Sequence, residues 1–235
     1  PRQDGKSYYR DENTDGQGSF SGQNVISNNA PGAQAVYAAD LDGDGDQDAL
    51  SASSSFGGDN RIAWYRNTAG GFASQNVISR NVKGARSVFA ADLDGDGDMD
   101  VLSASKGDGK IAWYENTSGY GTFSDQKVIS NDAANARSVY AADLDGDGDK
   151  DVLSASETLA WYENTDGKGT FSTQKVIAAS GPYGTVFATD LDGDGDPDVL
   201  SASQKGNRIA WHSNDIEQGQ GFGNAQPIVR RLAEK

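Results

Sequence analysis

Aspartate and glycine recur in one short motif, Asp-Leu-Asp-Gly-Asp-Gly-Asp-x-Asp, which the chain contains four times. The copies are named aspartate loops 1 to 4 and span residues 40–48, 92–100, 143–151 and 190–198. Each loop has carboxylates at positions 1, 3, 5, 7 and 9 and a glycine at position 6. Alternate residues of a tight turn direct oxygens inward and glycine permits a sharp bend, so this spacing suits a loop wrapped around a hard cation.

Ordinary turns also favour aspartate and glycine, and they are the simplest alternative for these loops. Five aspartates within nine residues repel one another, however, and a bound divalent cation would remove that repulsion. Calcium suits the numerous oxygen donors best, because Mg²⁺ keeps more of its water and softer metals prefer His or Cys. An EF-hand is excluded, since position 12 holds serine and the residues after each loop read as a strand.

Position 7 of each loop would contribute its backbone carbonyl to such a cation. Its side chain would then lie outside the ligand sphere or contact the cation through water. The position-7 residues are Asp46, Asp98, Asp149 and Asp196.

The composition fits a turn-rich, all-β protein, with 30 glycines, 5 prolines and 35% hydrophobic residues in 235. The formal net charge is −15, and the four loops supply 20 of the 35 acidic residues. Four Ca²⁺ ions would add eight positive charges and bring the balance to about −7. No basic stripe is present to neutralise phosphates, which argues against a nucleic-acid partner.

Cysteine is absent from the chain, which excludes disulfides and thiolate metal sites. The sequence contains no apolar run long enough to span a membrane and no signal peptide.

A pair of aliphatic residues recurs about every 50 residues, from Val25-Ile26 to Ile228-Val229, and a phenylalanine precedes each pair. That period is the length of a four-stranded propeller blade. In the second repeat, residues 87–91, 100–105, 111–116 and 123–129 have the alternation and the β-branched or aromatic residues of strands. We therefore predict a single β-propeller domain or fragment over residues 1–235, built from four-stranded antiparallel blades. The full blades are expected at residues 35–79, 86–129, 137–177 and 185–229.

Residues 7–26 match only the third and fourth strands of a repeat, which makes them an N-terminal half-blade. Four blades and half of another do not close a ring neatly. Either the chain belongs to a longer array, or a second copy completes the half-blade in a homo-oligomer. The sequence leaves both arrangements open.

The repeat, as in Asp92-Leu93-Asp94-Gly95-Asp96-Gly97-Asp98-Met99-Asp100, resembles the FG-GAP/VCBS repeat family, and the resemblance covers most of the chain. It implies a calcium site on each blade, in the loop between the first two strands. The half-blade has no such loop, so four sites are expected. The implied ligands are Asp40, Asp42, Asp44 and Asp48 in loop 1, Asp92, Asp94, Asp96 and Asp100 in loop 2, Asp143, Asp145, Asp147 and Asp151 in loop 3, and Asp190, Asp192, Asp194 and Asp198 in loop 4.

Each expected third strand contains two adjacent aromatic residues, or a tryptophan and a histidine in the last repeat, and together they form two rows across the repeats. The tryptophans Trp64, Trp113, Trp161 and Trp211 are expected to pack between neighbouring blades, with a sugar-stacking platform as the alternative. The adjacent row of Tyr65, Tyr114, Tyr162 and His212 should point to the other face and lie nearer to solvent. His212, the only histidine, is expected to be a surface replacement for tyrosine.

No nucleophile, base and orienting residue can be assembled from a chain with one His and no Cys, so we expect a non-enzymatic protein. The first hypothesis is a calcium-binding scaffold or interaction module of an extracellular or cell-surface protein, with a protein or glycan ligand that the sequence does not identify. The alternatives are a carbohydrate-binding propeller lectin and an accessory domain of a polysaccharide-active enzyme.

Overall fold

The computed structural model describes residues 24–179, 181–215, 221–223 and 226–227, and all regular elements in these residues are β-strands. Four antiparallel four-stranded sheets follow one another along the chain, and sequential strands are neighbours in each. Sheet 1 contains β1 (Ala33–Ala39), β2 (Asp48–Ser54), β3 (Asn60–Tyr65) and β6 (Asn76–Ser79). Sheet 2 contains β7 (Ala85–Ala91), β8 (Asp100–Ser105), β9 (Lys110–Tyr114) and β10 (Lys127–Ser130). Sheet 3 contains β11 (Ser138–Ala142), β12 (Asp151–Ala155), β13 (Leu159–Tyr162) and β14 (Lys175–Ala178). Sheet 4 contains β15 (Thr185–Thr189), β16 (Asp198–Ser203), β17 (Arg208–His212) and β20 (Gln226–Pro227).

A small hairpin follows the third strand of each sheet and pairs an asparagine with a phenylalanine. In sheet 1 it consists of β4 (Asn67–Thr68) and β5 (Gly71–Phe72), and in sheet 4 of β18 (Asn214–Asp215) and β19 (Gly221–Phe222). Single bridges, Asn116 to Phe123 and Asn164 to Phe171, take the same place in sheets 2 and 3. We call these four elements the Asn–Phe hairpins.

The expected all-β class is therefore confirmed, but the third and fourth strands of each repeat have different limits from those predicted. In sheet 2, β9 ends at Tyr114 and β10 begins at Lys127. The reason is that Asn116 and Phe123 pair with each other in the hairpin. The expected half-blade at residues 7–26 lies almost entirely outside the described residues.

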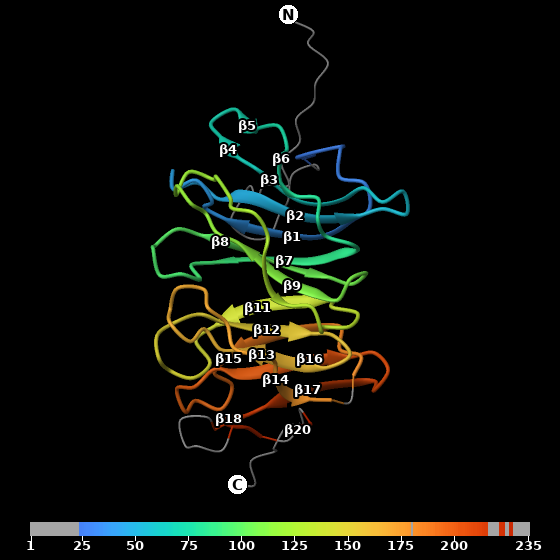
Figure 1. Ribbon diagram of the computed structural model, residues 1–235, viewed down its shortest axis with the longest axis vertical. Coiled ribbons are helices and arrows are strands. Elements are labelled where there is room, and N and C mark those ends of the chain that lie inside the picture. Colours follow the sequence, from blue (N-terminus) through green and yellow to red (C-terminus); the bar gives the residue numbers. More distant parts are fainter. Residues whose placement is uncertain (1–23, 180, 216–220, 224–225, 228–235) are drawn as a thin grey trace, which may run out of the picture.

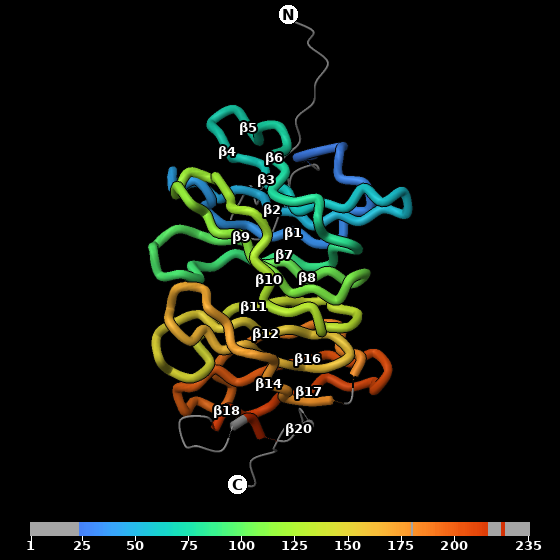
Figure 2. The backbone as a smooth tube through the Cα atoms, viewed as in Figure 1, coloured from blue at the N-terminus to red at the C-terminus, as the bar shows by residue number. Residues whose placement is uncertain are grey.

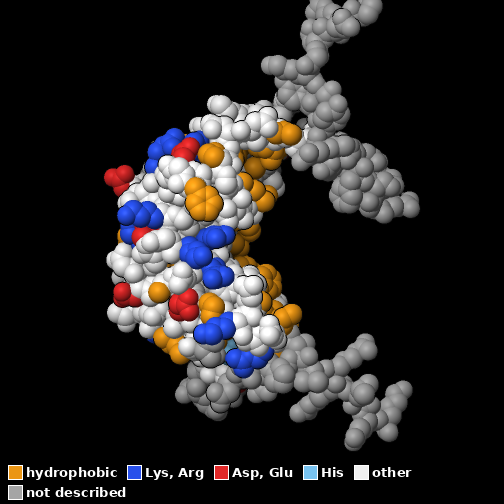
Figure 3. All heavy atoms as spheres, turned by 90° about the vertical axis from the view of Figure 1, so that its right-hand side faces the viewer, with side chains coloured by type: hydrophobic (Ala, Val, Ile, Leu, Met, Phe, Trp, Pro, Cys, Tyr) orange, Lys and Arg blue, Asp and Glu red, His pale blue; other side chains and the backbone are white. Residues whose placement is uncertain are grey.

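The sheets are stacked in chain order along the long axis of the molecule (Figures 1 and 2). Neighbouring sheets meet through their first strands β1, β7, β11 and β15. Seen from the side, the stack curves around a hollow where hydrophobic side chains gather (Figure 3). The described residues thus form an open stack and not a closed ring.

Aromatic side chains connect these first strands in a row. The ring centroids of Tyr37 and Phe89 are 4.7 Å apart, those of Phe89 and Tyr140 4.6 Å, and those of Tyr140 and Phe187 4.8 Å. One aromatic residue from each sheet therefore contacts the next, which fixes the spacing of the stack.

Three of the four tryptophans of the third strands, Trp64, Trp113 and Trp161, pack between adjacent sheets, as predicted. The rings of Trp64 and Phe123 meet edge to face with centroids 6.4 Å apart, although Trp64 lies in sheet 1 and Phe123 in the hairpin that follows the third strand of sheet 2. Trp113 with Phe171 and Trp161 with Phe222 repeat this contact between the following sheets. Because Trp64, Trp113 and Trp161 are buried, they do not form a sugar-stacking platform.

The prediction of an accessible tyrosine row is wrong. Tyr65, Tyr114, Tyr162 and His212 are all buried, with at most 3% of their surface exposed. The second strand of each sheet is buried along nearly its whole length as well. Alternation places the two aromatic rows on opposite faces, and the stacking of sheets covers both faces. The rings of the tyrosine row are therefore not accessible to a sugar in this arrangement, and His212 is not a surface residue.

Candidate metal centre

Each aspartate loop connects the first two strands of its sheet. Loop 1 joins β1 to β2, loop 2 joins β7 to β8, loop 3 joins β11 to β12 and loop 4 joins β15 to β16. Because position 9 is also the first residue of the second strand, one end of every loop is fixed by the ladder of the sheet.

Backbone amides and glycine conformation hold the loops closed. The position-6 amide donates to the position-1 carboxylate, for example from Gly97 to Asp92 over 3.0 Å. The position-6 glycines have φ between +91° and +105°, a region that other residues rarely occupy. They are Gly45, Gly97, Gly148 and Gly195. The predicted need for glycine at the bend is thus confirmed.

Three carboxylates converge in every loop, with ligand atoms within 4.8 Å of one another. Positions 1 and 3 belong to all four clusters, while the third member differs. The clusters are Asp40, Asp42 and Asp48 in loop 1, Asp92, Asp94 and Asp96 in loop 2, Asp143, Asp145 and Asp151 in loop 3, and Asp190, Asp192 and Asp194 in loop 4. The other expected ligands, Asp44, Asp100, Asp147 and Asp198, lie in the same loops but outside these clusters, as do Asp46, Asp98, Asp149 and Asp196 at position 7.

The position-9 aspartate is a buried connector within its sheet. In sheet 2, Oδ2 of Asp100 accepts from the amide of Leu93 at 3.0 Å, and Oδ1 accepts from the amide of Asn116 at 2.8 Å. Asp48, Asp151 and Asp198 make the same pair of bonds in the other sheets. This carboxylate thus ties its loop to the Asn–Phe hairpin of the same sheet.

Burial and neighbouring carboxylates both disfavour charge in the loops. Burial raises the pKa of Asp100 and of Asp151 to about 7, although their two amide bonds act in the opposite direction. Burial, followed by the charge of Asp96, raises the pKa of Asp94. A cation between the carboxylates would reverse these effects by favouring the ionised forms.

The residues present fit a hard divalent cation. The donors are all oxygen, which excludes preference for a soft metal and suits Ca²⁺. In loop 1, one carboxylate oxygen of Asp40 and one of Asp42 are buried without a hydrogen-bond partner. A buried, unpaired carboxylate oxygen is costly, and a cation is the partner that it lacks.

The Asn–Phe hairpins cover the loops of the preceding sheet, a role that the sequence analysis did not find. Nδ2 of Asn116 donates to the carbonyl of Leu41 in loop 1 over 3.0 Å, and Asn164 and Asn214 make the equivalent bond to loops 2 and 3. The hairpin backbone is close as well, since a Cβ added to Gly43 would lie 3.1 Å from the carbonyl oxygen of Gly119. The signal in the sequence is an Asn-Thr or Asn-Asp pair that recurs two residues after the third-strand aromatic row.

Arg66 is a second residue that the sequence analysis missed. It directly follows β3, and its guanidinium forms ion pairs with Asp42 and Asp44 of loop 1. The distance from Nη2 to Oδ2 of Asp44 is 3.0 Å. The pKa of Asp44 is held below its ordinary value, first by the amide of Asp46 and then by Arg66. Loop 1 therefore has a cationic side chain of its own.

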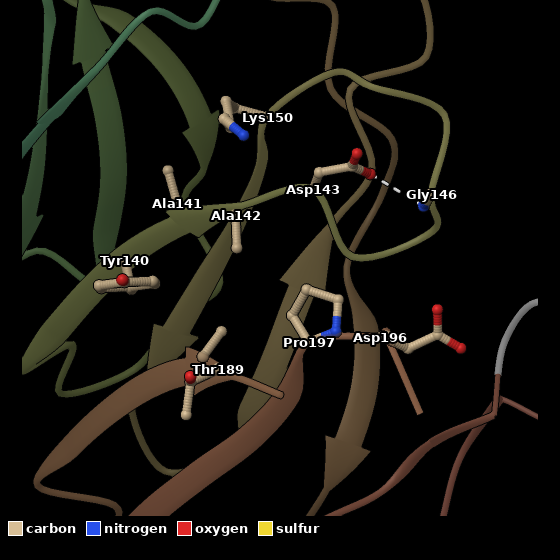
Figure 4. Close-up of a pocket in the computed structure, with 11 residues that line it drawn as sticks. Tyr140, Ala141, Ala142, Asp143, Gly146, Lys150, Thr189, Asp196 and Pro197 are labelled. Carbon is tan, nitrogen blue, oxygen red and sulfur yellow. Dashed lines mark hydrogen bonds between the residues drawn. The ribbon is translucent and has the colours of Figure 1, made fainter. Parts of the chain in front are cut away.

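A pocket of about 410 Å³ lies between sheets 3 and 4, where two aspartate loops come side by side (Figure 4). Asp143 and Lys150 line it from loop 3, and Asp196 and Pro197 line it from loop 4. Tyr140 of the aromatic row forms part of the wall. The pocket is thus the space between two neighbouring loops, with mixed charge at its rim.

Comparison with known proteins assigns the repeats of this chain to a known repeat family. The model of the FG-GAP-like repeat matches residues 2–51, 42–103, 92–154 and 151–201. Among solved structures, the chain is similar to the crystal structure of the V. cholerae biofilm matrix protein Bap1, with 21% identity and a TM-score of 0.43. That match covers 78% of this chain and 33% of the other, so the chain spans about a third of that protein's length. The search of curated proteins found no match.

In the part of the chain that the structure describes, no helix is long and apolar enough to span a membrane.

Proposed function

The chain belongs to the FG-GAP-like repeat family, and from that premise we propose that it is a calcium-binding scaffold or interaction module without enzymatic activity. The observation that carries the proposal is the recurrence of one loop, with converging carboxylates, at the same place in each of four sheets. The loops are set by local hydrogen bonds and lie next to the contacts between sheets. Such sites serve to stabilise an assembly of sheets and do not need to act on a substrate.

Calcium would act in this scaffold by neutralising charge where the sheets join. Positions 1, 3, 5 and 9 of each loop would supply side-chain oxygens, and position 7 a backbone carbonyl. Asp100, which already binds the amides of Leu93 and Asn116, would couple the loop to its hairpin. Since that hairpin contacts loop 1, filling one loop would also favour the docking of the neighbouring sheet.

We also propose that the four sheets are blades of a β-propeller. Strand number, antiparallel order, contact through the first strands and the curvature of the stack support this assignment (Figure 3). A closed ring requires further blades, either from a longer chain or from a second copy of this one. Light scattering with and without Ca²⁺ separates these two arrangements, because a discrete dimer is expected only for the second.

An extracellular or cell-surface location agrees with this chemistry. Oxygen-ligand calcium sites of extracellular modules bind at roughly 10⁻⁴ to 10⁻³ M, and calcium reaches such concentrations outside cells. Loops with short aspartate side chains on glycine-rich turns are suited to a Kd for calcium in that range. A protein or glycan partner would then bind the scaffold that the loops stabilise.

The test is thermal unfolding with EDTA and with Ca²⁺. Each filled site stabilises the folded state by roughly 2.7 kcal/mol when free calcium is 100-fold above Kd. We expect a marked fall of Tm on chelation, recovery with Ca²⁺ and much weaker recovery with Mg²⁺ at the same concentration. Isothermal titration should give close to four sites for each chain. An unchanged Tm after chelation, together with no heat of calcium binding, would contradict the proposal.

A further inference from the structure

The residue that directly follows the third-strand aromatic row differs in charge among the four sheets. It is Arg66 in sheet 1, Glu115 in sheet 2, Glu163 in sheet 3 and Ser213 in sheet 4. In sheets 1, 2 and 3 this residue lies close enough to the aspartate loop of its own sheet to interact with it. Arg66 pairs with Asp42 and Asp44 of loop 1. Glu115 acts by its charge on Asp94 of loop 2, and Glu163 acts on Asp145 of loop 3.

Arg66 holds two of the carboxylates that a cation in loop 1 would use. Its Nε contacts Asp42 at position 3, and its Nη2 lies 3.0 Å from Asp44 at position 5. The side chain of Asp42 is only 4% exposed, whereas that of Arg66 is 49% exposed. The guanidinium therefore reaches in from solvent and covers the carboxylates.

Loops 2 and 3 have the opposite arrangement. Glu115 is paired with Lys127, whose ammonium also lies 4.3 Å from the centre of the Trp113 ring. Glu163 and Lys175 repeat this pair beside Trp161. The ammonium groups are therefore directed to the glutamates and the tryptophans. In loops 2 and 3, none of the described lysines or arginines forms an ion pair with the aspartates.

We propose that Arg66 is a built-in counter-ion of loop 1, so that this loop takes up calcium after loops 2 and 3, in which a glutamate takes the place of the arginine. The inference rests on the proposed calcium binding and deepens it by ranking the sites. A calcium ion entering loop 1 must displace the guanidinium from Asp42 and Asp44, whereas calcium in loops 2 and 3 meets no competing guanidinium and has a glutamate nearby. Part of the negative charge of loop 1 is thus compensated without calcium, although one oxygen of Asp40 and one of Asp42 still lack a partner there.

The wild-type protein allows a direct test that is resolved by site. In a calcium titration followed by NMR, the position-6 amides of Gly45, Gly97 and Gly148 report on loops 1, 2 and 3, because each donates to the position-1 carboxylate. We expect the Gly97 and Gly148 resonances to reach saturation first and Gly45 to require roughly tenfold more calcium, the effect of one nearby unit charge on a divalent ion in water.

Charge variants test the cause of that order. Arg66→Gln should raise the affinity of loop 1 by roughly tenfold, and Arg66→Glu by more, because each removes the competing cation. Glu115→Arg should make loop 2 a second late site. Arg80→Gln is the matched control, because Arg80 lies in the same repeat and pairs with Asp59, 3.0 Å away, outside the loops. Circular dichroism shows whether each variant retains its strands.

The outcomes separate this inference from the proposed function. If loops 1, 2 and 3 fill together and Arg66→Gln leaves the midpoint of Gly45 unchanged, the counter-ion role is wrong while calcium binding stands. If the wild type binds no calcium in any loop, both are wrong. Should the Arg66 variants lose their strands, the order of filling in the wild type still decides, because early saturation of Gly45 overturns the inference.

Discussion

Two glycines of the Asn–Phe hairpins are required because a tryptophan of the preceding sheet fills the space where a side chain would be. A Cβ on Gly121 would lie 2.3 Å from Cζ2 of Trp64, and a Cβ on Gly169 would lie 2.2 Å from Cζ2 of Trp113. Both glycines also have positive φ, +74° and +78°. At the residue scale, neighbouring sheets are therefore in contact where a tryptophan ring packs directly on the backbone of a glycine.

Changing Gly121 to alanine should lower the free energy of unfolding by about 2–4 kcal/mol, because overpacking and left-handed strain combine. Urea unfolding followed by tryptophan fluorescence measures the loss. Gly70→Ala is the control, since no atom lies within 4 Å of its added Cβ and its φ is not positive. Equal losses in the two variants would show that the Trp64 contact does not set the spacing between sheets.

His212 makes the stability of the protein depend on pH. Burial lowers its pKa below the ordinary value of 6.5, and Nε2 is buried with no hydrogen-bond partner within the described ranges. Below pH 6.5 the unfolded chain therefore takes up a proton at His212 that the folded chain does not. Stability from this group is fully present above pH 6.5 and is lost as the pH falls, by up to about 1.4 kcal/mol for each pH unit.

Relative to His212→Phe, the wild type should lose free energy of unfolding between pH 6.5 and pH 5. The raised pKa values of Asp100 and Asp151 act in the opposite direction, but they do so in both proteins and cancel in this comparison. Phenylalanine keeps a flat ring in the buried site and cannot titrate there. The quantity to compare is the slope of stability against pH in the two proteins, measured by urea unfolding at fixed calcium. Parallel slopes would mean that His212 is not held neutral in the folded state.

Residue-level sequence reasoning succeeds where the interaction is local. The loop bends and the need for Gly45 and Gly97 follow from spacing within nine residues. The ion pair of Arg66 with Asp44 joins residues that are 22 apart, and no periodic pattern marks it, because the other repeats have Glu or Ser there. Its role became visible only when the sheet brought the end of β3 beside loop 1.

At the scale of elements, the Asn–Phe hairpin connects each sheet to the one before it. Asn116 is buried, and its Nδ2 donates to Leu41 of loop 1 and, over 3.4 Å, to Met99 of its own loop. The partners Asn116 and Leu41 are 75 residues apart. The hairpin is thus the element that links two aspartate loops.

Asn116→Ala should destabilise the protein by about 1–3 kcal/mol, because it leaves buried carbonyls without a donor. Asn67→Ala is the matched control. Asn67 holds the same place in sheet 1, but in the described structure its Nδ2 donates only to Gln47 of its own loop, over 3.1 Å. We expect the control to lose less than about 1 kcal/mol in urea unfolding. A larger loss from Asn67→Ala would contradict the linking role.

Sequence patterns located the strands but not their outer limits. The cores of β8 and β9 follow from β-branched and aromatic residues. Phe123, in contrast, looks like the start of a strand by its apolar character, yet it pairs with Asn116 in the hairpin and packs on Trp64. The accessible tyrosine row failed for a related reason. Alternation tells which residues share a face, but only the stacking of sheets decides whether that face meets water.

At the scale of the whole molecule, the repulsion between the negatively charged aspartate loops opposes the stacking of the sheets. The chain has a formal charge of −15, and its aspartate loops carry 20 of the 35 acidic residues. The hairpin contacts hold successive loops near one another, so their charges repel along the stack as well as within each loop. Among the described residues, Arg66 relieves this repulsion in loop 1 through its ion pairs, and salt in the solvent can screen the repulsion that remains.

Raising the salt concentration should therefore stabilise the calcium-free protein more than the calcium-loaded protein. The screening length falls from about 30 Å at 0.01 M to about 10 Å at 0.1 M, which weakens repulsion between loops while leaving hydrophobic packing almost unchanged. We expect Tm in EDTA to rise by a few degrees over this range, as about 1–2 kcal/mol would produce in a chain of this size, and to rise less in excess Ca²⁺. Tetramethylammonium chloride is the control salt, because its cation is too large to enter a loop. If only NaCl raised Tm, sodium binding within the loops would be the cause; if both salts acted equally with and without calcium, repulsion between the aspartate loops would not limit the stability of the stack.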